Sequence, residues 1–376
     1  MRVLFSTTPG DGHVLPVLPL ARAVAGAGHE VAFATGPEYR PRLEAEGFTP
    51  FGVGLSAAEL DRQFAPRQAA LQLDTVPVPG RRQLVFTARF ATLEAPARLD
   101  DLHTVADEWH PDAIVHESCE LAAPIVAAAR GIPSYHHSFG PRTPLHVLRH
   151  AFAHVAPLWE RSGVEPDALL GAYRGTYLDV CPAALQAEPP PPGARVQSIR
   201  VADARREDHA GPPLVYATLG TMTFSRLERF RDLLDAFAPV DCEVFVTVGA
   251  HLDPEALAPI PANARVHGFV PQADILPRAA AVVTHAGSGS TLGALAHGCP
   301  MLLLPQGADQ FENAAACVAA GAAIALYPGD QAPEQLRAAL VELLGEPRYA
   351  DAARAIADEI AAMPSAAQVA ARLFVG

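Results

Sequence analysis

Short apolar runs alternate with amphipathic stretches over the first third of the chain. The apolar runs predict buried strands at 2–7, 29–35, 112–116 and 132–137. The stretches between them carry apolar residues at helical spacing, at 13–28, 37–47 and 120–131. A strand followed by a helix, repeated at this spacing, predicts a parallel sheet with helices on both faces.

Two stretches interrupt this alternation. Residues 55–110 and 141–175 are less regular, so we expect them to be loops and helices inserted on the sheet. Inserted segments of this kind commonly carry ligand specificity, because the sheet holds them in place while their sequence varies.

A second alternation of strands and helices begins at residue 213. Its apolar runs predict strands at 213–220, 242–249, 264–270, 280–285 and 300–305. Its amphipathic stretches predict helices near 224–238, 289–298, 310–321, 333–344 and 347–361. This half of the chain therefore predicts a second parallel sheet.

The two series are separated by a stretch rich in proline and charge, which contains four consecutive prolines. We place a semi-rigid linker at 191–212, between domains at 1–190 and 213–361. The segment 362–376 is expected to be a helix that packs back on the first domain. The expected fold class is α/β, with two doubly wound Rossmann-like domains facing each other across a cleft. Ligands of such sheets bind beyond the carboxyl ends of the strands.

Composition excludes several classes of protein. The 376 residues suit two domains, and the formal net charge of -13 argues against nucleic-acid binding, which needs a basic surface. The chain contains no lysine. A Walker phosphate loop and a pyridoxal-phosphate Schiff base both require that residue, so neither is expected.

Cysteine spacing and the N-terminus indicate a cytoplasmic protein. The five cysteines are scattered, without a C-x-x-C pair or a His/Cys cluster at zinc spacing, and are expected to be reduced thiols. The chain begins in a predicted strand rather than in a signal peptide, and no apolar run reaches the roughly 18 residues that span a bilayer.

The segment GDGHVLP at 10–16 follows the first predicted strand and is a candidate catalytic site. A dinucleotide fingerprint is weakly supported, because its third glycine and the acidic residue after the second strand are absent. His13 starts the next helix, and the positive end of that helix is expected to keep the imidazole neutral and ready to accept a proton. A surface or capping role is the alternative for a lone histidine.

A histidine base works better beside a carboxylate that orients it. Glu117 ends another predicted strand and is the preferred partner if the first and fourth strands are neighbours. Glu120 is its rival, with the alternative role of a favourable charge in the first turn of a helix. Asp11, in the same loop as His13, is a third candidate.

The segment THAGSGST at 284–291 joins a predicted strand to a predicted helix and suggests a phosphate site. Its glycines allow close approach of a ligand, and the first amides of the helix can hold phosphate oxygens together with nearby hydroxyls. His285 adds a donor that can neutralise charge. Further along, Asp309 and Gln310 offer a carboxylate and an amide to sugar hydroxyls; a helix N-cap is the alternative for Asp309.

Three segments together resemble inverting, metal-independent glycosyltransferases of GT-B fold, and in particular actinobacterial enzymes that glycosylate polyketides and other natural products. The segments are 10–35, the stretch FVPQADILPRAAAVVTHAGSGSTLGALAHGCPMLLLP at 269–305, and GADQFENA at 307–314. Their order and spacing span nearly the whole chain. The resemblance implies transfer of a sugar, expected to be a deoxysugar on thymidine diphosphate, to a hydroxyl of a hydrophobic aglycone.

The resemblance also implies roles for matching positions. His13 would be the general base and Glu117 its carboxylate partner. The donor-binding residues would contact the diphosphate, the nucleobase and the sugar. For the diphosphate they are Thr221, His285, Gly287, Gly289, Ser290 and Thr291; for the nucleobase, Val270 and Gln272; for the sugar, Asp309 and Gln310.

The acceptor side is less defined by the sequence. Candidate acceptor-binding residues are polar or aromatic and lie after predicted strands or in the irregular stretches: Asp11, Phe64, Phe86, Phe90, His136, His137, Phe139 and Phe152. The phenylalanines have core packing as their alternative.

No Asp-x-Asp triplet occurs, so neither a metal nor another cofactor is expected. The expected partners are a nucleotide sugar and a small aglycone, without nucleic acid or a membrane span, and a homodimer is left open. An epimerase or hydrolase that acts on the nucleotide sugar alone is the alternative function.

Overall fold

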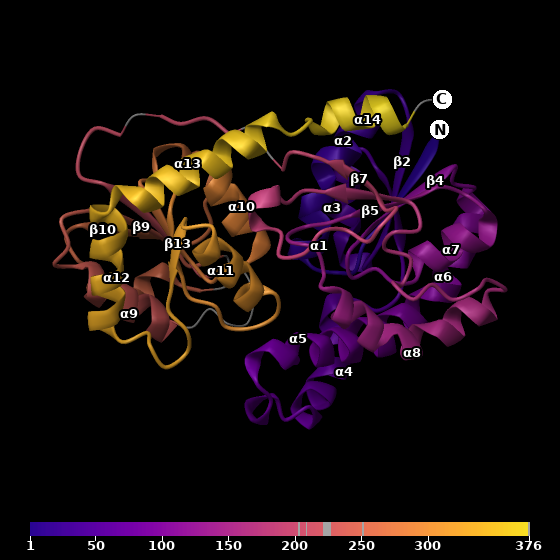
Figure 1. Ribbon diagram of the computed structural model, residues 1–376, viewed down its shortest axis with the longest axis horizontal. Helices are drawn as coiled ribbons and strands as arrows, with labels where there is room; N and C mark the ends of the chain where they lie inside the picture. The colour runs from indigo at the N-terminus through magenta and orange to yellow at the C-terminus, as the bar shows by residue number, and fades with distance from the viewer. Residues whose placement is uncertain (202–203, 208, 221–226, 250–251, 375–376) are drawn as a thin grey trace. The chain divides into compact units, whose positions relative to one another are not determined.

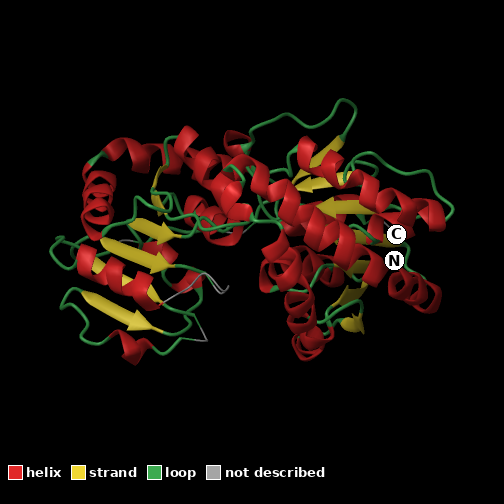
Figure 2. Ribbon diagram, turned by 90° about the horizontal axis from the view of Figure 1, so that it is seen from below, coloured by secondary structure: helices red, strands yellow, loops and turns green. Residues whose placement is uncertain are grey.

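Two separate sheets, each composed entirely of parallel strands, form the framework of the protein in the computed structural model (Figures 1 and 2). The structure describes residues 1–201, 204–207, 209–220, 227–249 and 252–374. They form two units. The first comprises Met1–Cys181, Glu188–Ile199 and the chain from Pro364 onward, and the second comprises Pro182–Ala187 and Arg200–Met363.

The first unit contains seven strands in the order β3-β2-β1-β4-β5-β6-β7. Their bounds are β1 Arg2–Ser6, β2 Glu30–Thr35, β3 Thr49–Gly52, β4 Ala113–Glu117, β5 Ser134–His137, β6 Thr176–Asp179 and β7 Arg195–Ser198. The order reverses between β1 and β4, which pair directly with Ser6 opposite His116. Loops that leave the carboxyl ends of these two strands therefore start side by side, which is where ligands of such sheets bind.

The helix expected at 13–28 is broken into three pieces. α1 (Asp11–Val14) is followed by a 3₁₀ turn (Leu15–Val17) and by α2 (Leu18–Gly26). Pro16 and Pro19 lie in the first positions of the second and third pieces, where a missing backbone N–H is tolerated. α3 (Arg40–Ala45) and α7 (Ala123–Arg130) lie close to the expected positions.

The stretches expected to be insertions are mainly helical. They contain α4 (Ala57–Ala70), α5 (Val78–Phe86), a π-helical segment (Thr87–Glu94), α6 (Ala95–Trp109) and α8 (Leu145–Arg161). Proline lies inside α4 and α8 and at the start of α5 and α6. The π turn shifts the phase of the apolar face. A single helical period is therefore not maintained along this part of the sequence.

The second unit contains six strands in the order β10-β9-β8-β11-β12-β13. Their bounds are β8 Leu214–Thr218, β9 Glu243–Thr247, β10 Ala264–His267, β11 Ala281–Thr284, β12 Met301–Leu303 and β13 Ala323–Ala325. β8 and β11 are neighbours at the point where the order reverses. Helices α9 (Leu227–Phe237) and α12 (Pro333–Gly345) share one core with these strands.

Three further helices complete the second unit. They are α10 (Ser288–Ala296), α11 (Gln310–Ala319) and α13 (Pro347–Ala362). Figure 2 shows helices flanking the strand layer of this unit. α10 and α11 begin directly after β11 and β12, so their amino ends lie at the carboxyl edge of the sheet.

The segment expected to be a linker contains a strand. β7 pairs with β6 and extends the first sheet, although it is short and shows no alternation of buried and exposed residues that would reveal it in the sequence. The last helix, α14 (Ala366–Leu373), packs against α2 in the same unit (Figure 1). The Tyr135 hydroxyl donates to the Leu373 carbonyl at 3.3 Å. Among the described residues, no helix is both long enough and apolar enough to cross a bilayer.

Candidate active site

His13 and Glu117 meet at the junction of β1 and β4. α1 carries His13 immediately after the loop that leaves β1, and Glu117 is the last residue of β4. Nδ1 of His13 lies 3.3 Å from Oε2 of Glu117. The Glu117 side chain is completely buried, whereas 21% of the His13 side chain is exposed. The pairing of β1 with β4 thus brings together the histidine and the carboxylate preferred from the sequence.

Backbone and hydroxyl donors hold Glu117 in its charged form. Oε1 accepts hydrogen bonds from the amide of Thr8 at 3.1 Å and from its hydroxyl at 2.9 Å, and Oε2 accepts one from the amide of Cys119 at 2.7 Å. Burial alone would raise the pKa of Glu117, but His13 and these hydrogen bonds outweigh burial and lower it. The residue is therefore a carboxylate beside the imidazole.

The same carboxylate makes His13 more basic. Burial is the largest influence and lowers the pKa of His13, but the charge and hydrogen bond of Glu117, together with the charge of Glu94, outweigh burial and raise the pKa. The helix end was expected to disfavour the charged imidazole, but the pKa shift has the opposite direction, because α1 has only four residues and the Glu117 carboxylate lies beside the ring. With Nδ1 facing Glu117, Nε2 is the ring nitrogen left to accept a proton.

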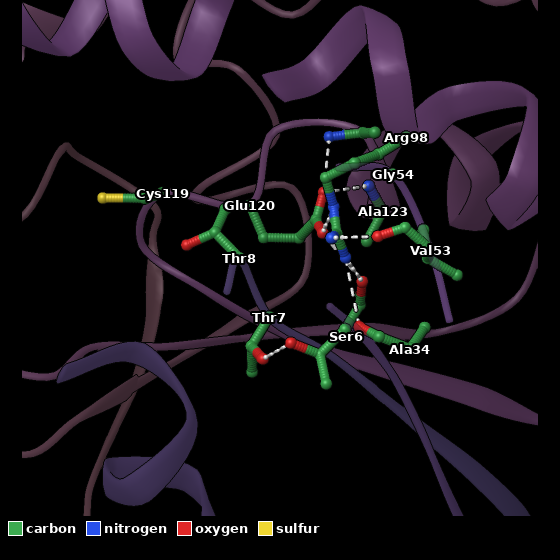
Figure 3. A network of polar contacts seen from close by, with 12 residues as sticks. Ser6, Thr7, Thr8, Ala34, Val53, Gly54, Arg98, Cys119, Glu120 and Ala123 are labelled. Carbon is green, nitrogen blue, oxygen red and sulfur yellow. Dashed lines mark hydrogen bonds and ion pairs between the residues drawn. The ribbon is translucent and has the colours of Figure 1, made fainter. Parts of the chain in front are cut away.

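Glu120, the rival partner, has a structural role. Its Oε2 accepts hydrogen bonds from Nε of Arg98 at 2.6 Å and from the hydroxyl of Ser6 at 2.8 Å (Figure 3). Its Oε1 accepts from the amides of Ala122 at 2.9 Å and Ala123 at 3.2 Å, where α7 begins. The alternative role considered for Glu120, a charge at the start of a helix, is the role that this geometry supports.

Arg98 completes this buried network. Its guanidinium also donates to the carbonyls of Val53 and Ala34, each at 3.1 Å, and to the Ser6 hydroxyl at 3.2 Å (Figure 3). Arg98 therefore links α6 to β1, to the end of β2 and to the segment after β3. Glu120 joins this network to the turn 117–120, in which the backbone amide of Glu120 donates to the carbonyl of Glu117 at 3.1 Å.

Asp11, the third candidate acid, does not pair with His13 in any contact of the described residues. Its carboxylate accepts a hydrogen bond from the hydroxyl of Tyr39 at 3.2 Å and lies 3.9 Å from the guanidinium of Arg42. Asp11 therefore lies on the same loop as the base but faces different partners.

Two phenylalanines contact the His13 ring. The centroid of Phe139 lies 5.3 Å from that of the imidazole and the centroid of Phe90 lies 5.8 Å from it, both in edge-on arrangements. Phe86 packs on Phe90 at 5.3 Å and is itself buried. Phe64 belongs to a small buried cluster with Leu60 and Leu93. Phe152 packs against the main core of this unit.

Glu94, an acidic residue that was not predicted from the sequence, lies close to the phenylalanines that contact His13. Glu94 ends the π-helical segment that carries Phe90; only 3% of the residue is exposed, and Oε1 lies 3.3 Å from Nε of Arg89. Burial raises the pKa of Glu94 to about 7. The charge of Glu94 also contributes to the raised pKa of His13. Glu94 could not be placed near His13 from the sequence, because the segment 55–110 has no steady period of apolar residues.

His136 and His137 lie in the core at the end of β5. The ring of His136 stacks on Tyr177 at 4.6 Å, and its Nε2 lies 3.0 Å from the hydroxyl of Ser118. Burial lowers the pKa of His137 to about 4 and lowers that of His136 well below its usual range. Within the described residues neither ring contacts His13, so their assignment to the acceptor stays a prediction.

In the second unit, His285 follows β11 and fits between two glycines. A Cβ atom on Gly220 would lie 2.6 Å from Cε1 of His285, and one on Gly287 would collide with the same ring. Burial lowers the pKa of His285 to about 4. The free protein therefore carries a neutral imidazole here, which can donate a hydrogen bond but does not neutralise charge as the sequence analysis expected.

The amino end of α10 presents the remaining groups of the THAGSGST motif. Gly287 is the N-cap and Gly289 is exposed. The hydroxyl of Ser290 accepts a hydrogen bond from Nε2 of Gln272 at 2.8 Å. The hydroxyl of Thr291 is buried and has no hydrogen-bond partner among the described residues. The first turn of α10 therefore offers amides and a hydroxyl to an anionic ligand.

Asp309 connects the amino ends of α11 and α10. It occupies the N-cap position of α11 but makes no capping hydrogen bond. Instead its Oδ2 accepts hydrogen bonds from the hydroxyl of Ser288 at 2.7 Å and from the side-chain amide of Asn313 at 3.1 Å. Asn313 also donates to the carbonyl of Ala286 at 2.9 Å. The sequence analysis did not identify Asn313, although it follows Asp309 by one helical turn.

Gln310 stabilises its own loop. Its Oε1 accepts hydrogen bonds from the amides of Gln306 at 2.8 Å and Gly307 at 3.1 Å. Ala308 in this loop has φ of 52°, a left-handed conformation that is uncommon for a residue with a side chain. The loop is thus held in one shape by Gln310.

The nucleobase candidates Val270 and Gln272 are both half-buried. Thr221, a candidate for the diphosphate, lies outside the described residues. Phe269, which directly precedes Val270, is 68% exposed. Phe269 was not predicted to be a binding residue from the sequence, since phenylalanine is more often buried.

Family models match both halves of the chain. The model described as erythromycin biosynthesis protein CIII-like, N-terminal domain, matches residues 22–201, and the corresponding C-terminal domain matches residues 231–375.

Curated relatives match along nearly their whole lengths. L-demethylnoviosyl transferase of Streptomyces niveus is 32% identical, with 98% of this chain and 97% of that protein covered. The 3-alpha-mycarosylerythronolide B desosaminyl transferase of Saccharopolyspora erythraea is 30% identical, with 98% of this chain and 96% of that protein covered.

Solved structures share the fold. The glycosyltransferase SnogD from Streptomyces nogalater has a TM-score of 0.75 and 26% identity, covering 100% of this chain and 98% of that chain. Spinosyn rhamnosyltransferase SpnG, complexed with thymidine diphosphate, has a TM-score of 0.80 and 26% identity, with both chains covered completely. The two parallel sheets, the family models and these relatives agree, and the chain belongs to the erythromycin biosynthesis protein CIII-like family of GT-B glycosyltransferases that act on natural products.

Proposed function

We propose that this glycosyltransferase moves a sugar from thymidine diphosphate to a hydroxyl of a hydrophobic natural-product acceptor, with inversion at the anomeric carbon. The observation that carries the proposal is the 3.3 Å contact between His13 Nδ1 and Glu117 Oε2. It provides a histidine with one nitrogen oriented by a buried carboxylate and the other available to accept a proton.

In the proposed reaction, Nε2 of His13 takes the proton of the acceptor hydroxyl as its oxygen attacks the anomeric carbon. The bond between that carbon and the diphosphate breaks, and its electron pair leaves on the phosphate oxygen. Glu117 stabilises the imidazolium that forms. General-base assistance of this kind is worth about 10²–10⁴ in rate.

The second unit supplies groups suited to the leaving diphosphate. The amides at the start of α10 and the Thr291 hydroxyl are donors, and His285 is neutral and able to donate as well. They would stabilise the charge that develops on the leaving phosphate. In this proposal the carboxylate of Asp309, which also accepts from Ser288, binds sugar hydroxyls, and the exposed Phe269 stacks on the base.

The apolar character of the acceptor is inferred from the surroundings of His13. Phe90 and Phe139 contact the ring, and the buried Phe86 packs behind Phe90. Such a surface suits an aromatic or macrocyclic aglycone rather than a sugar. Thymidine diphosphate is inferred from relatives solved with that nucleotide.

The test compares the unaltered protein with His13→Ala. With dTDP-glucose and a panel of hydroxylated polyketide aglycones, we expect the variant to lose about two orders of magnitude or more in turnover. It should retain the thermal stabilisation that dTDP produces. Unchanged turnover would contradict the assignment of the base. Hydrolysis or epimerisation of dTDP-glucose without acceptor, at the rate of the full reaction, would favour the alternative function.

A further inference from the structure

A cysteine thiol lies beside the His13–Glu117 pair and takes no part in the proposed transfer. Sγ of Cys119, one ring nitrogen of His13 and one carboxylate oxygen of Glu117 all lie within 4.8 Å of one another, and Nδ1 is the ring nitrogen that faces Glu117, at 3.3 Å. Glu117 and Cys119 are buried, and His13 is largely so. Three different kinds of donor atom therefore converge on one small region at the end of β4.

This donor set has the chemistry that Zn²⁺ prefers. Zinc binds imidazole nitrogen, thiolate sulfur and carboxylate oxygen at about 2.0–2.3 Å, so ligand atoms on one tetrahedral ion lie about 3–4 Å apart. The atoms here lie at most 4.8 Å apart and need to approach one another by about 1–2 Å to share an ion. A thiolate and a carboxylate together also balance the charge of a divalent cation, which favours its binding in a buried place.

The geometry points to an inhibitory Zn²⁺ site formed by His13, Glu117 and Cys119. Binding replaces the thiol proton of Cys119, which is released to solvent, by a zinc–sulfur bond. Three protein ligands leave the fourth position of the ion for water. The inhibitory part of this inference rests on the proposed function, because it requires that His13 be the base.

Inhibition follows from the tautomer that the metal imposes. A neutral imidazole whose Nδ1 lone pair binds zinc carries its single proton on Nε2. The nitrogen that would accept the acceptor's proton then becomes a donor. Zinc would bind behind the ring rather than on its acceptor-facing side, so we expect kcat to fall while the acceptor KM changes little.

The other cysteines offer a matched control. Cys317 is also buried, in α11 of the second unit, and among the described residues the only set of three ligating side chains includes Cys119. Cys317→Ala removes a thiol of similar burial without touching that set.

Cobalt titration of chelator-treated protein tests the metal site without using activity. We expect Co²⁺ to bind at one equivalent with a thiolate-to-cobalt charge-transfer absorption, in the unaltered protein and in Cys317→Ala. The absorption should be lost in Cys119→Ala and in Cys119→Ser, each first shown to be folded by circular dichroism. A band that persists in both Cys119 variants, or an unaltered protein without cobalt binding, would overturn the site.

Turnover of dTDP-glucose and the best aglycone in the panel tests inhibition. Micromolar Zn²⁺ should reduce kcat at least tenfold in the unaltered protein and in Cys317→Ala, and a chelator should restore it. Cys119→Ala should need at least tenfold more zinc for the same fractional loss. Equal zinc sensitivity in the unaltered and Cys119→Ala proteins would contradict the inference. Failure of the proposed function would appear separately, as a His13→Ala variant with unchanged turnover. That result would leave the comparison of cobalt binding between the unaltered protein and the Cys119 variants as it stands.

Discussion

At the scale of single residues, the charge of Glu117 determines the behaviour of His13. The carboxylate is buried, accepts three hydrogen bonds from Thr8 and Cys119, and raises the pKa of the neighbouring imidazole. His13 is active as a base only when unprotonated. Turnover should therefore decline as the pH falls through the raised pKa of His13.

Glu117→Gln tests this coupling. Loss of the negative charge removes the influence that raises the pKa of His13, so the acidic limb of the kcat/KM profile should move to lower pH. The plateau rate should fall by roughly tenfold or more, because the imidazolium is no longer stabilised. Profiles of chelator-treated protein measure both effects. An acidic limb that stays in place, or that moves to higher pH, would show that Glu117 does not set this pKa.

In the second unit, the side-chain amide of Asn313 connects the amino ends of two helices. Asn313 donates to Asp309, Ser288 and the carbonyl of Ala286, which are all acceptors at the amino ends of α10 and α11. Leaving buried acceptors unpaired costs about 1–3 kcal/mol.

Asn313→Leu should therefore lower the free energy of unfolding by about that amount and weaken dTDP binding. Urea denaturation and calorimetric titration with dTDP measure the two effects. Arg348→Gln serves as the control, since its ion pair with Glu342 is on the surface and contributes little to stability. Equal stability of the two variants would contradict the structural role of Asn313.

At the scale of elements, the Arg98–Glu120 pair connects α6 and α7 to the central strands. Both side chains are almost completely buried. Removing one partner of a buried ion pair leaves the other charge uncompensated, which costs about 3–5 kcal/mol.

We expect Arg98→Met to lose about that much stability, measured by urea denaturation. The double variant Arg98→Met/Glu120→Gln should recover a substantial part of the loss, because glutamine is uncharged and still offers an oxygen to the amides that start α7. A double variant less stable than Arg98→Met would show that the charge of Glu120 is not the source of the cost.

Helices and strands differ in how well the sequence predicts them. The buried central strands β1, β4, β8 and β11 appear as continuous apolar runs, because a parallel sheet is covered on both faces. The edge strands β3, β7 and β13 and the interior strand β6 were not predicted. They are short, and β3 and β7 lie partly in solvent, so their sequences carry little hydrophobic signal.

At the scale of the whole molecule, buried histidines make stability depend on pH. Burial lowers the pKa of His116 and of His137 to about 4. In the unfolded chain their pKa is about 6.5, so the unfolded state binds protons first as the pH falls. Their contribution to stability is complete above about pH 6.5 and is lost progressively toward pH 4.

Each of these two histidines should lower the free energy of unfolding by about 1 kcal/mol on moving from pH 7.5 to pH 5.5. His13 has a raised pKa and Glu94 has a pKa raised to about 7, and both contribute with the opposite sign in this range. Urea denaturation at the two pH values measures the difference, and His137→Gln should make the change on acidification less unfavourable. The same change in the unaltered protein and in His137→Gln would contradict the burial of a neutral His137.

The sequence by itself determined the alternation of strands and helices, the division into two sheets and the motifs at the strand ends. These depend on local patterns of apolar residues, glycine and proline, which are visible along the chain. It also identified His13, Glu117 and Asp309, because their places at strand ends follow from those patterns.

Only the tertiary structure decided which partner each of these residues has. Pairing of β1 with β4 brings Glu117 to His13, whereas Glu120 pairs with Arg98. Arg98 lies in α6, a helix that was not predicted from the sequence pattern of that stretch. The tertiary structure also placed Cys119 beside the base and Asn313 beside Asp309. The direction of each pKa shift depended on burial and on charges far apart in sequence, which local patterns do not contain.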